Sequence, residues 1–177
     1  ISKSGYTQVV PGQEIRYTFK DIGNNSTVPL DSFYWRDTLP TDAVRLDKII
    51  TGTYSARLNY KVVFQTNLND TQRVLADNLN TQKNYTLDAS PAALGLASNE
   101  YVTQVTFLFG RVPGGFKQVE TPYIYCDVLS SLSHEYRFAN KCDVGGMWQN
   151  QWVQATDRWV TIIYRGGPVP TLPRTGY

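Results

Sequence analysis

The sequence predicts an all-β fold, an antiparallel β-sandwich, and three observations lead to that prediction. Aromatic and β-branched residues alternate with polar ones over short runs, as at 15–20 and 160–164. Turn sequences separate the runs, among them PG at Pro11, VPGG at 112–115 and GG at Gly145. About ten short strands at this spacing are typical of an antiparallel sandwich.

The strands are expected in order at residues 15–20, 33–39, 43–50, 60–66, 101–109, 123–129, 135–144, 151–155 and 160–164. The last two form an extra C-terminal hairpin that turns at Ala155 to Arg158. Between the fourth and fifth strands, the stretch from Leu68 to Ser98 is polar and rich in Asn, Asp and Thr. It reads as an elaborated connection with a single helical turn at Ala92 to Ala97.

Length and composition indicate one folded domain. The chain has 177 residues, which we divide into a β-sandwich at 1–165 and an extended Pro/Gly-rich linker at 166–177. Seventeen basic and fifteen acidic side chains give a net charge of +2, and no basic run marks a nucleic-acid partner. No apolar run approaches the roughly 20 residues of a membrane span. ISKSGYTQ is neither a Met start nor a signal peptide, so we expect a piece of a longer precursor.

Residues for catalysis are scarce. The only histidine is His134, in SSLSHE, so a two-histidine metal site is impossible and nothing in the sequence orients this residue for a triad. The glycine pairs at 114–115 and 145–146 fit no phosphate loop and read as turns. The sequence therefore predicts a protein that is not an enzyme, with no metal and no cofactor.

The most specific motif lies near the C-terminus. Leu172, Pro173, Arg174, Thr175 and Gly176 spell LPRTG, which resembles the LPxTG sorting signal of Gram-positive surface proteins. Four fixed letters coincide by chance on the order of once in 10⁵ positions at average residue usage. The resemblance implies that a sortase cleaves between Thr175 and Gly176 and links the Thr175 carbonyl to a cell-wall amine. Sortase and peptidoglycan are then the expected partners, and the location is the extracellular, wall-anchored surface.

The N-terminal part carries a second resemblance. VVPGQEIRYTFKDIGNNST followed by FYWRDTLP is similar to the opening of DUF11-type surface repeats, and FANKCDVGG is similar to their closing strand. The first of these matches covers about the first 50 residues of the chain. Those repeats are Ig-like sandwiches in stalks of bacterial surface proteins. The resemblance therefore implies an Ig-like sandwich.

Many Gram-positive stalk domains of this kind carry an intramolecular Lys–Asn isopeptide bond beside an assisting acid. The reaction needs an uncharged amine, a carboxamide and burial that shifts the pKa values of the amine and the acid. Lys3, Asp37 and Asn140 share strand parity with apolar neighbours and lie on a first, a middle and a late strand. Lys3 and Asn140 are therefore the candidates for such a bond, with Asp37 assisting. The alternative is that Lys3 is a frayed terminal residue, that Asp37 caps the turn before Leu39-Pro40, and that Asn140 satisfies local backbone.

Two cysteines, Cys126 and Cys142, lie on runs that we expect to be neighbouring strands. Outside a cell two such thiols can form a disulfide. Closing a loop of about 15 residues would contribute roughly 3 kcal/mol in the chain-entropy model. The alternative is a pair of free, buried thiols that pack as small apolar groups.

Tryptophans support a rival function. Trp148, Trp152 and Trp159 cluster among amide side chains in the C-terminal part, as in an aromatic platform for sugars. Cross-strand packing of Trp152 against Trp159 is the competing explanation. The sequence thus predicts a structural stalk or spacer that presents a more distal adhesive region. The alternative is a surface module that binds a carbohydrate or another host ligand.

Overall fold

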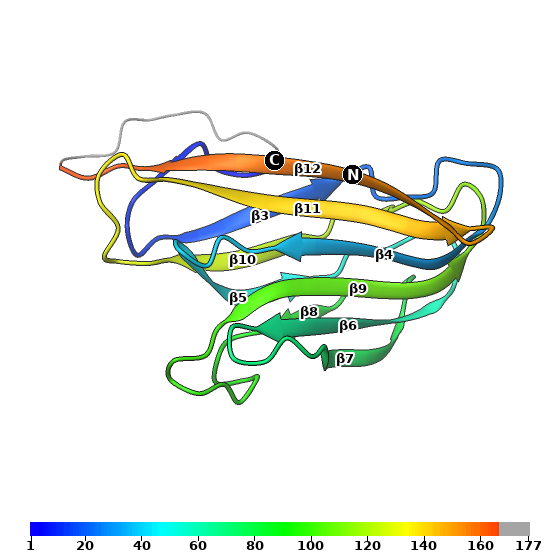
Figure 1. Cartoon of the computed structure of the whole chain (residues 1–177), viewed down its shortest axis with the longest axis horizontal. Helices are drawn as coiled ribbons and strands as arrows, with labels where there is room; N and C mark the ends of the chain where they lie inside the picture. Colours follow the sequence, from blue (N-terminus) through cyan, green and yellow to red (C-terminus); the bar gives the residue numbers. More distant parts are fainter. Residues whose placement is uncertain (167–177) are drawn as a thin grey trace.

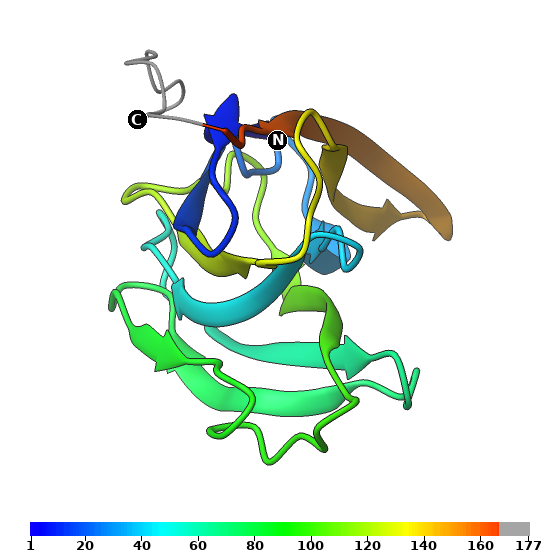
Figure 2. The same ribbon diagram turned by 90° about the vertical axis from the view of Figure 1, so that its left-hand side faces the viewer.

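The computed structural model describes residues 1–166 as a sandwich of two β-sheets, which Figure 1 shows face-on and Figure 2 end-on. Sheet A has the strand order β1 (Ser2–Ser4), β3 (Glu14–Lys20), β10 (Tyr123–Val128), β5 (Val44–Ile50), β8 (Thr86–Asp88). Sheet B has the order β2 (Gln8–Val9), β12 (Gln151–Ile163), β11 (Arg137–Trp148), β4 (Leu30–Thr38), β9 (Val102–Val112), β6 (Asn59–Thr66), β7 (Arg73–Asn80). The predicted all-β sandwich is confirmed.

Strand pairing is antiparallel throughout the described residues, with the single exception of β2 on β12. Within residues 1–166 there is no helix, and so none that could cross a membrane. The two sheets enclose an aromatic core, in which the rings of Trp35 and Phe107 stack with centroids 4.1 Å apart. The apolar residues that alternate with polar ones along the strands thus point into the interior, as expected for two facing sheets.

The C-terminal hairpin differs from the prediction. β12 runs without interruption through the expected turn at residues 155–158, and the turn lies at Gln149 and Asn150. Both residues have positive φ, 48° and 62°, which matches the two-residue turn that suits the twist of paired strands. The predicted position of the turn was wrong because Gln149 and Asn150 adopt positive φ without a glycine that would indicate the turn in the sequence.

Gly145 and Gly146 form no turn either, and lie inside β11. A Cβ atom on Gly145 would lie 2.7 Å from the Val153 carbonyl oxygen, and one on Gly146 would lie 3.0 Å from Leu30 Cβ. Glycine is needed here for close packing of neighbouring strands.

The middle connection is more ordered than its polar sequence suggests. Two strands, β7 and β8, lie within residues 68–98 and extend the two sheets at one edge. A turn with backbone bonds from Leu94 N to Ser90 O and from Leu96 N to Pro91 O follows them. The exposed outer face of an edge strand leaves its sequence mostly polar, which explains why periodicity missed these strands.

Candidate functional site

Three polar side chains meet in the core between the sheets, and these are Lys3, Asp37 and Asn140. Lys3 is on β1, at the edge of sheet A, while Asp37 on β4 and Asn140 on β11 belong to sheet B. The Lys3 and Asp37 side chains have no exposed surface, and Asn140 is fully buried. The parity argument therefore identified three residues that the fold brings together from distant parts of the chain.

Asp37 lies between the other two side chains and uses a different oxygen for each. Lys3 Nζ donates to Asp37 Oδ1 at 2.6 Å, and Asn140 Nδ2 donates to Asp37 Oδ2 at 3.3 Å. The Asn140 carbonyl oxygen and the Tyr17 hydroxyl are buried and have no hydrogen-bond partner among the described residues. Unpartnered polar atoms in a core are costly, which makes this cluster unusual.

Aromatic rings surround the Lys3 amine. Its Nζ lies 4.0 Å from the centroid of the Phe19 ring and 4.4 Å from that of Tyr17. Both rings come from β3, which pairs with β1 in register so that Lys3 faces Phe19. The rings exclude water from the amine, and their cation–π attraction replaces only a small part of the lost hydration.

Burial disfavours the charged form of both groups. It lowers the pKa of the Lys3 amine below its usual value, although the neighbouring Asp37 carboxylate opposes the shift. Burial likewise raises the pKa of Asp37, against the opposing effects of Lys3 and Asn140. The shifts favour a neutral amine beside a protonated acid, which is the state that nucleophilic attack by lysine requires.

Tyr17 also faces the cluster. Burial raises the pKa of its phenol well above the usual value, and the nearby side chains of Asn140 and Thr161 offset part of that shift. The phenol therefore stays protonated and able to donate a hydrogen bond. Sequence reasoning missed this residue, although Tyr17 has the inward parity of Ile15 and Phe19 that could have indicated it.

The cysteines are free in the structure and lie on facing sheets, since Cys126 is on β10 of sheet A and Cys142 on β11 of sheet B. The expectation that their strands are neighbours in one sheet was wrong, because the chain crosses between the sheets after β10. Burial raises the pKa of Cys142 to about 12 and that of Cys126 well above its usual value. A thiol count on denatured, unreduced protein tests this: we expect two thiols, and none would demonstrate a disulfide.

The three tryptophans do not form one platform. Trp152 packs edge-on against Tyr34 on the outer face of sheet B, with centroids 6.3 Å apart. Trp148 instead lines a pocket with Val153 on the other face of the same hairpin. The indole of Trp159 donates to the Tyr6 carbonyl oxygen at 2.9 Å. The cause is parity, since residues at odd spacing along a strand point to opposite faces.

Other predicted features do not join this cluster. His134 is exposed: its Nδ1 accepts a hydrogen bond from the Arg165 backbone N–H, and its Nε2 lies 3.8 Å from the exposed carboxylate of Glu135. Residues 1–166 contain no group of acidic, His and Cys side chains able to hold a metal ion. The LPRTG motif at 172–176 lies outside the described residues.

Comparisons with known proteins identify similar folds and no family. No family model matches the chain, and no curated protein matches it in sequence. Among solved structures, it is similar to ACE19, the collagen binding subdomain of the Enterococcus faecalis surface protein ACE. That match has 10% identity and a TM-score of 0.41, and it covers 92% of this chain and 94% of the other.

Two Corynebacterium diphtheriae structures are also similar. Domains D2 and D3 of the major pilin SpaD match with 13% identity and a TM-score of 0.41, over 90% of this chain and 50% of that one. A putative membrane anchored protein matches with 15% identity and a TM-score of 0.48, over 97% of this chain and 36% of that one. At these identities and TM-scores the similarities assign no role to any residue of this chain.

Proposed function

We propose that this domain is a rigid structural module of a Gram-positive surface protein, locked by an isopeptide bond between Lys3 and Asn140. The observation that carries the proposal is the position of Asp37, with one oxygen on the Lys3 nitrogen and the other on the Asn140 amide nitrogen. A single carboxyl group thereby contacts both the nucleophile and the leaving group.

The reaction balances without an external reagent. Neutral Lys3 Nζ attacks Asn140 Cγ, and a C–N bond forms while the amide oxygen takes up negative charge. Asp37 accepts the proton from the amine through Oδ1 and delivers one to the Asn140 nitrogen from Oδ2. That nitrogen leaves as ammonia when its bond to Cγ breaks. The Tyr17 phenol, protonated and next to Asn140, is the donor for the developing oxyanion.

Such a bond suits a mechanical role. It joins β1 of sheet A to β11 of sheet B, and the loop that it closes contains most of the chain. Tension applied between the two ends would pass from Lys3 directly to Asn140 and bypass the strands between them. A stalk that holds a distal region away from a surface benefits because force and proteolysis both act through opening of the fold.

Intact mass spectrometry tests the cross-link. We expect the wild-type protein to be lighter than its sequence mass by one ammonia, and digestion to release a branched peptide that joins Lys3 to Asn140. Lys3→Arg and Asn140→Ala should each have the full mass expected from their sequences. The matched controls are Lys20→Arg and Asn59→Ala, at exposed positions on β3 and β6, and both should retain the ammonia loss. Wild-type protein at full sequence mass would refute the bond.

Tyr17→Phe tests the assisting phenol. Because it removes one donor to the oxyanion and leaves the ring in place, newly folded protein should lose ammonia more slowly than the wild type and still reach completion. An unchanged rate in a mass time course would exclude Tyr17 from the reaction.

Anchoring is part of the proposal and rests on the LPRTG resemblance. We propose that a sortase cleaves after Thr175 and joins the domain to peptidoglycan at the bacterial surface. Incubation with a sortase and an oligoglycine peptide should yield a product of the mass expected for transfer. Thr175→Ala should yield none, and the same product from both proteins would contradict the assignment.

A further inference from the structure

A groove of about 670 Å³ lies on the outer face of sheet B, on the opposite side of the sheet from the cross-link cluster. Four strands provide its walls, and none of its residues takes part in the proposed cross-link. Its lining includes three cations together with amides and hydroxyls: Arg36, Lys141, Arg158, Gln104, Gln154, Thr38 and Thr156.

Strand register places two of the cations face to face. Lys141 on β11 is directly opposite Arg158 on β12, and both are exposed. Like charges directly opposite each other destabilise a sheet. Within residues 1–166 no carboxylate lies within ion-pair distance of either side chain. An anion supplied from outside would relieve this repulsion.

Asp143 holds the neighbouring side chains of the groove, Arg36 and Gln154, in a fixed arrangement. Its carboxylate accepts from Arg36 Nε at 2.9 Å and Nη2 at 2.6 Å, from the Tyr34 hydroxyl at 2.7 Å and from Gln154 Nε2 at 2.8 Å. Burial alone would raise the pKa of Asp143, but these hydrogen bonds hold it below the usual value. Asp143 therefore neutralises Arg36 and orders Gln154, which leaves Lys141 and Arg158 uncompensated.

A second carboxylate, Asp157, also lines the groove, and its Oδ2 accepts from the Lys3 backbone N–H at 2.8 Å.

Beyond Gln154 the same face of β12 presents Trp152, which is 59% exposed and packs against Tyr34. From Trp152 to Arg158 the strand rises about 20 Å. An aromatic ring, an amide, a hydroxyl and a cation thus follow one another along one line.

We propose that this face binds a linear anionic saccharide, with carboxylate or sulfate groups at Lys141 and Arg158 and a sugar ring against Trp152. Gln154 and Thr156 lie between these ends and meet the sugar hydroxyls. An acidic peptide fits less well, because the strands at this face already pair with each other and offer a peptide backbone no free partners. The site does not depend on the cross-link.

Calorimetric titration of the full chain with size-matched hexasaccharides tests the proposal. The probes are a sulfated heparin fragment, a hyaluronan fragment that carries carboxylates only, and neutral maltohexaose. We expect one or both anionic probes to bind, with an affinity that falls as ionic strength rises. Lys141→Gln/Arg158→Gln should weaken binding by about tenfold or more, and Trp152→Ala should weaken it as well. Lys83→Gln/Lys117→Gln, exposed cations elsewhere, should leave affinity unchanged.

Both groove variants should fold, since the double substitution removes a like-charge contact and Trp152 is largely exposed; circular dichroism checks this. Binding of the heparin fragment alone identifies sulfate as the required group, whereas binding of the hyaluronan fragment shows that carboxylates are sufficient. The proposal is overturned if neither anionic probe binds, if maltohexaose binds equally well, if a hexaglutamate peptide competes as strongly, or if the double variant binds like the wild type.

Discussion

Two ion pairs of nearly equal length show how much position matters in this molecule. Lys3 and Asp37 approach to 2.6 Å in the core, and Arg73 and Glu100 approach to 2.7 Å near the surface. The pKa shifts of the two acids are opposite. Burial raises the pKa of Asp37, whereas hydrogen bonds from Thr66, the Ala97 backbone and Arg73 lower that of Glu100.

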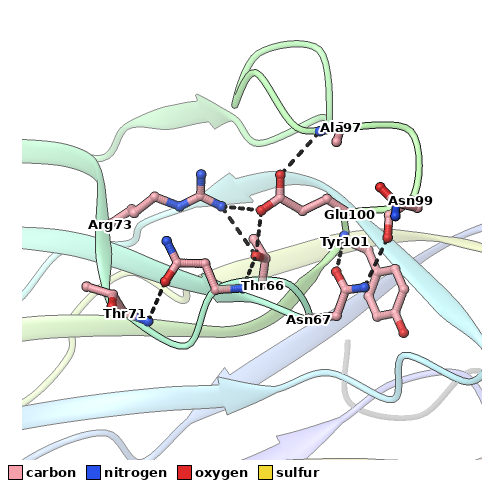
Figure 3. A network of polar contacts seen from close by, with 9 residues as sticks. Thr66, Asn67, Thr71, Arg73, Ala97, Asn99, Glu100 and Tyr101 are labelled. Atoms are coloured by element: carbon pink, nitrogen blue, oxygen red, sulfur yellow. Dashed lines mark hydrogen bonds and ion pairs between the residues drawn. The ribbon is translucent and has the colours of Figure 1, made fainter.

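Figure 3 shows the surface pair within a network that ties the end of β6 to the segment before β9. Glu100 Oε2 accepts from Thr66 Oγ1 at 2.6 Å, and Oε1 accepts from the Ala97 backbone N–H at 3.2 Å. Every donor there stabilises the ionised acid. In the core, rings surround the amine and one carboxyl faces two nitrogen atoms. An amine or guanidinium beside a carboxyl group thus holds two segments together in one region, and in the other it has the arrangement that the proposed cross-link requires.

The largest effect should come from Asp37→Ala. It removes the acid that the proposed cross-link needs and leaves Lys3 buried without a partner, which by itself costs about 3–5 kcal/mol. We expect full sequence mass and a much lower midpoint of denaturant unfolding, or no folded protein. A folded variant with the wild-type midpoint would show that the buried pair does not matter.

Asn140→Ala should have the next largest effect, because it prevents the proposed cross-link and retains the Lys3–Asp37 pair. A bond that closes a loop of more than 100 residues contributes about 5 kcal/mol in the chain-entropy model. Guanidinium unfolding and trypsin resistance measure the loss, with Asn59→Ala as the control. An unchanged midpoint would argue against a covalent bond.

A smaller effect should appear in the pH dependence of the uncross-linked Asn140→Ala variant. Because the pKa of Lys3 is lowered in the folded state, the unfolded chain binds more protons, and stability should rise with pH up to the ordinary value of 10.5. The raised pKa of Asp37 acts in the opposite direction, so its contribution is largest below 3.8 and falls as pH rises through the folded value.

Urea unfolding at a series of pH values measures these slopes. Adding Lys3→Met to Asn140→Ala should remove the alkaline rise. If the rise persists in the double variant, Lys3 is not its source.

The smallest effect should come from Arg73→Gln in the surface network. Glu100 keeps its bonds from Thr66 and Ala97, and exposed ion pairs contribute little. We expect a loss of at most about a quarter of that of Asp37→Ala, measured under the same denaturant conditions. A loss as large as that of Asp37→Ala would remove the distinction between the two regions.

Local patterns in the sequence were enough to predict much of this domain. Alternation with period two identified the long strands and gave Lys3, Asp37 and Asn140 their inward direction, because the parity of a strand is a property of a few consecutive residues. It failed where the deciding contact is distant. Gly145 and Gly146 look like a turn until the strands beside them are known, and β7 and β8 bury few of their residues, so that little periodicity marks them.

Register between strands is the part that only the tertiary structure decided. Cys126 and Cys142 are separated because β10 belongs to sheet A and β11 to sheet B. The register of β12 on β11 places the tryptophans on two different faces of the hairpin. The cations Arg36, Lys141 and Arg158 lie on three strands and form no cluster in the sequence. Strand pairing in the packed sandwich brings these three cations together on one face. The packing of the sandwich also places Asp37 between the Lys3 amine and the Asn140 amide, which are far apart in the sequence.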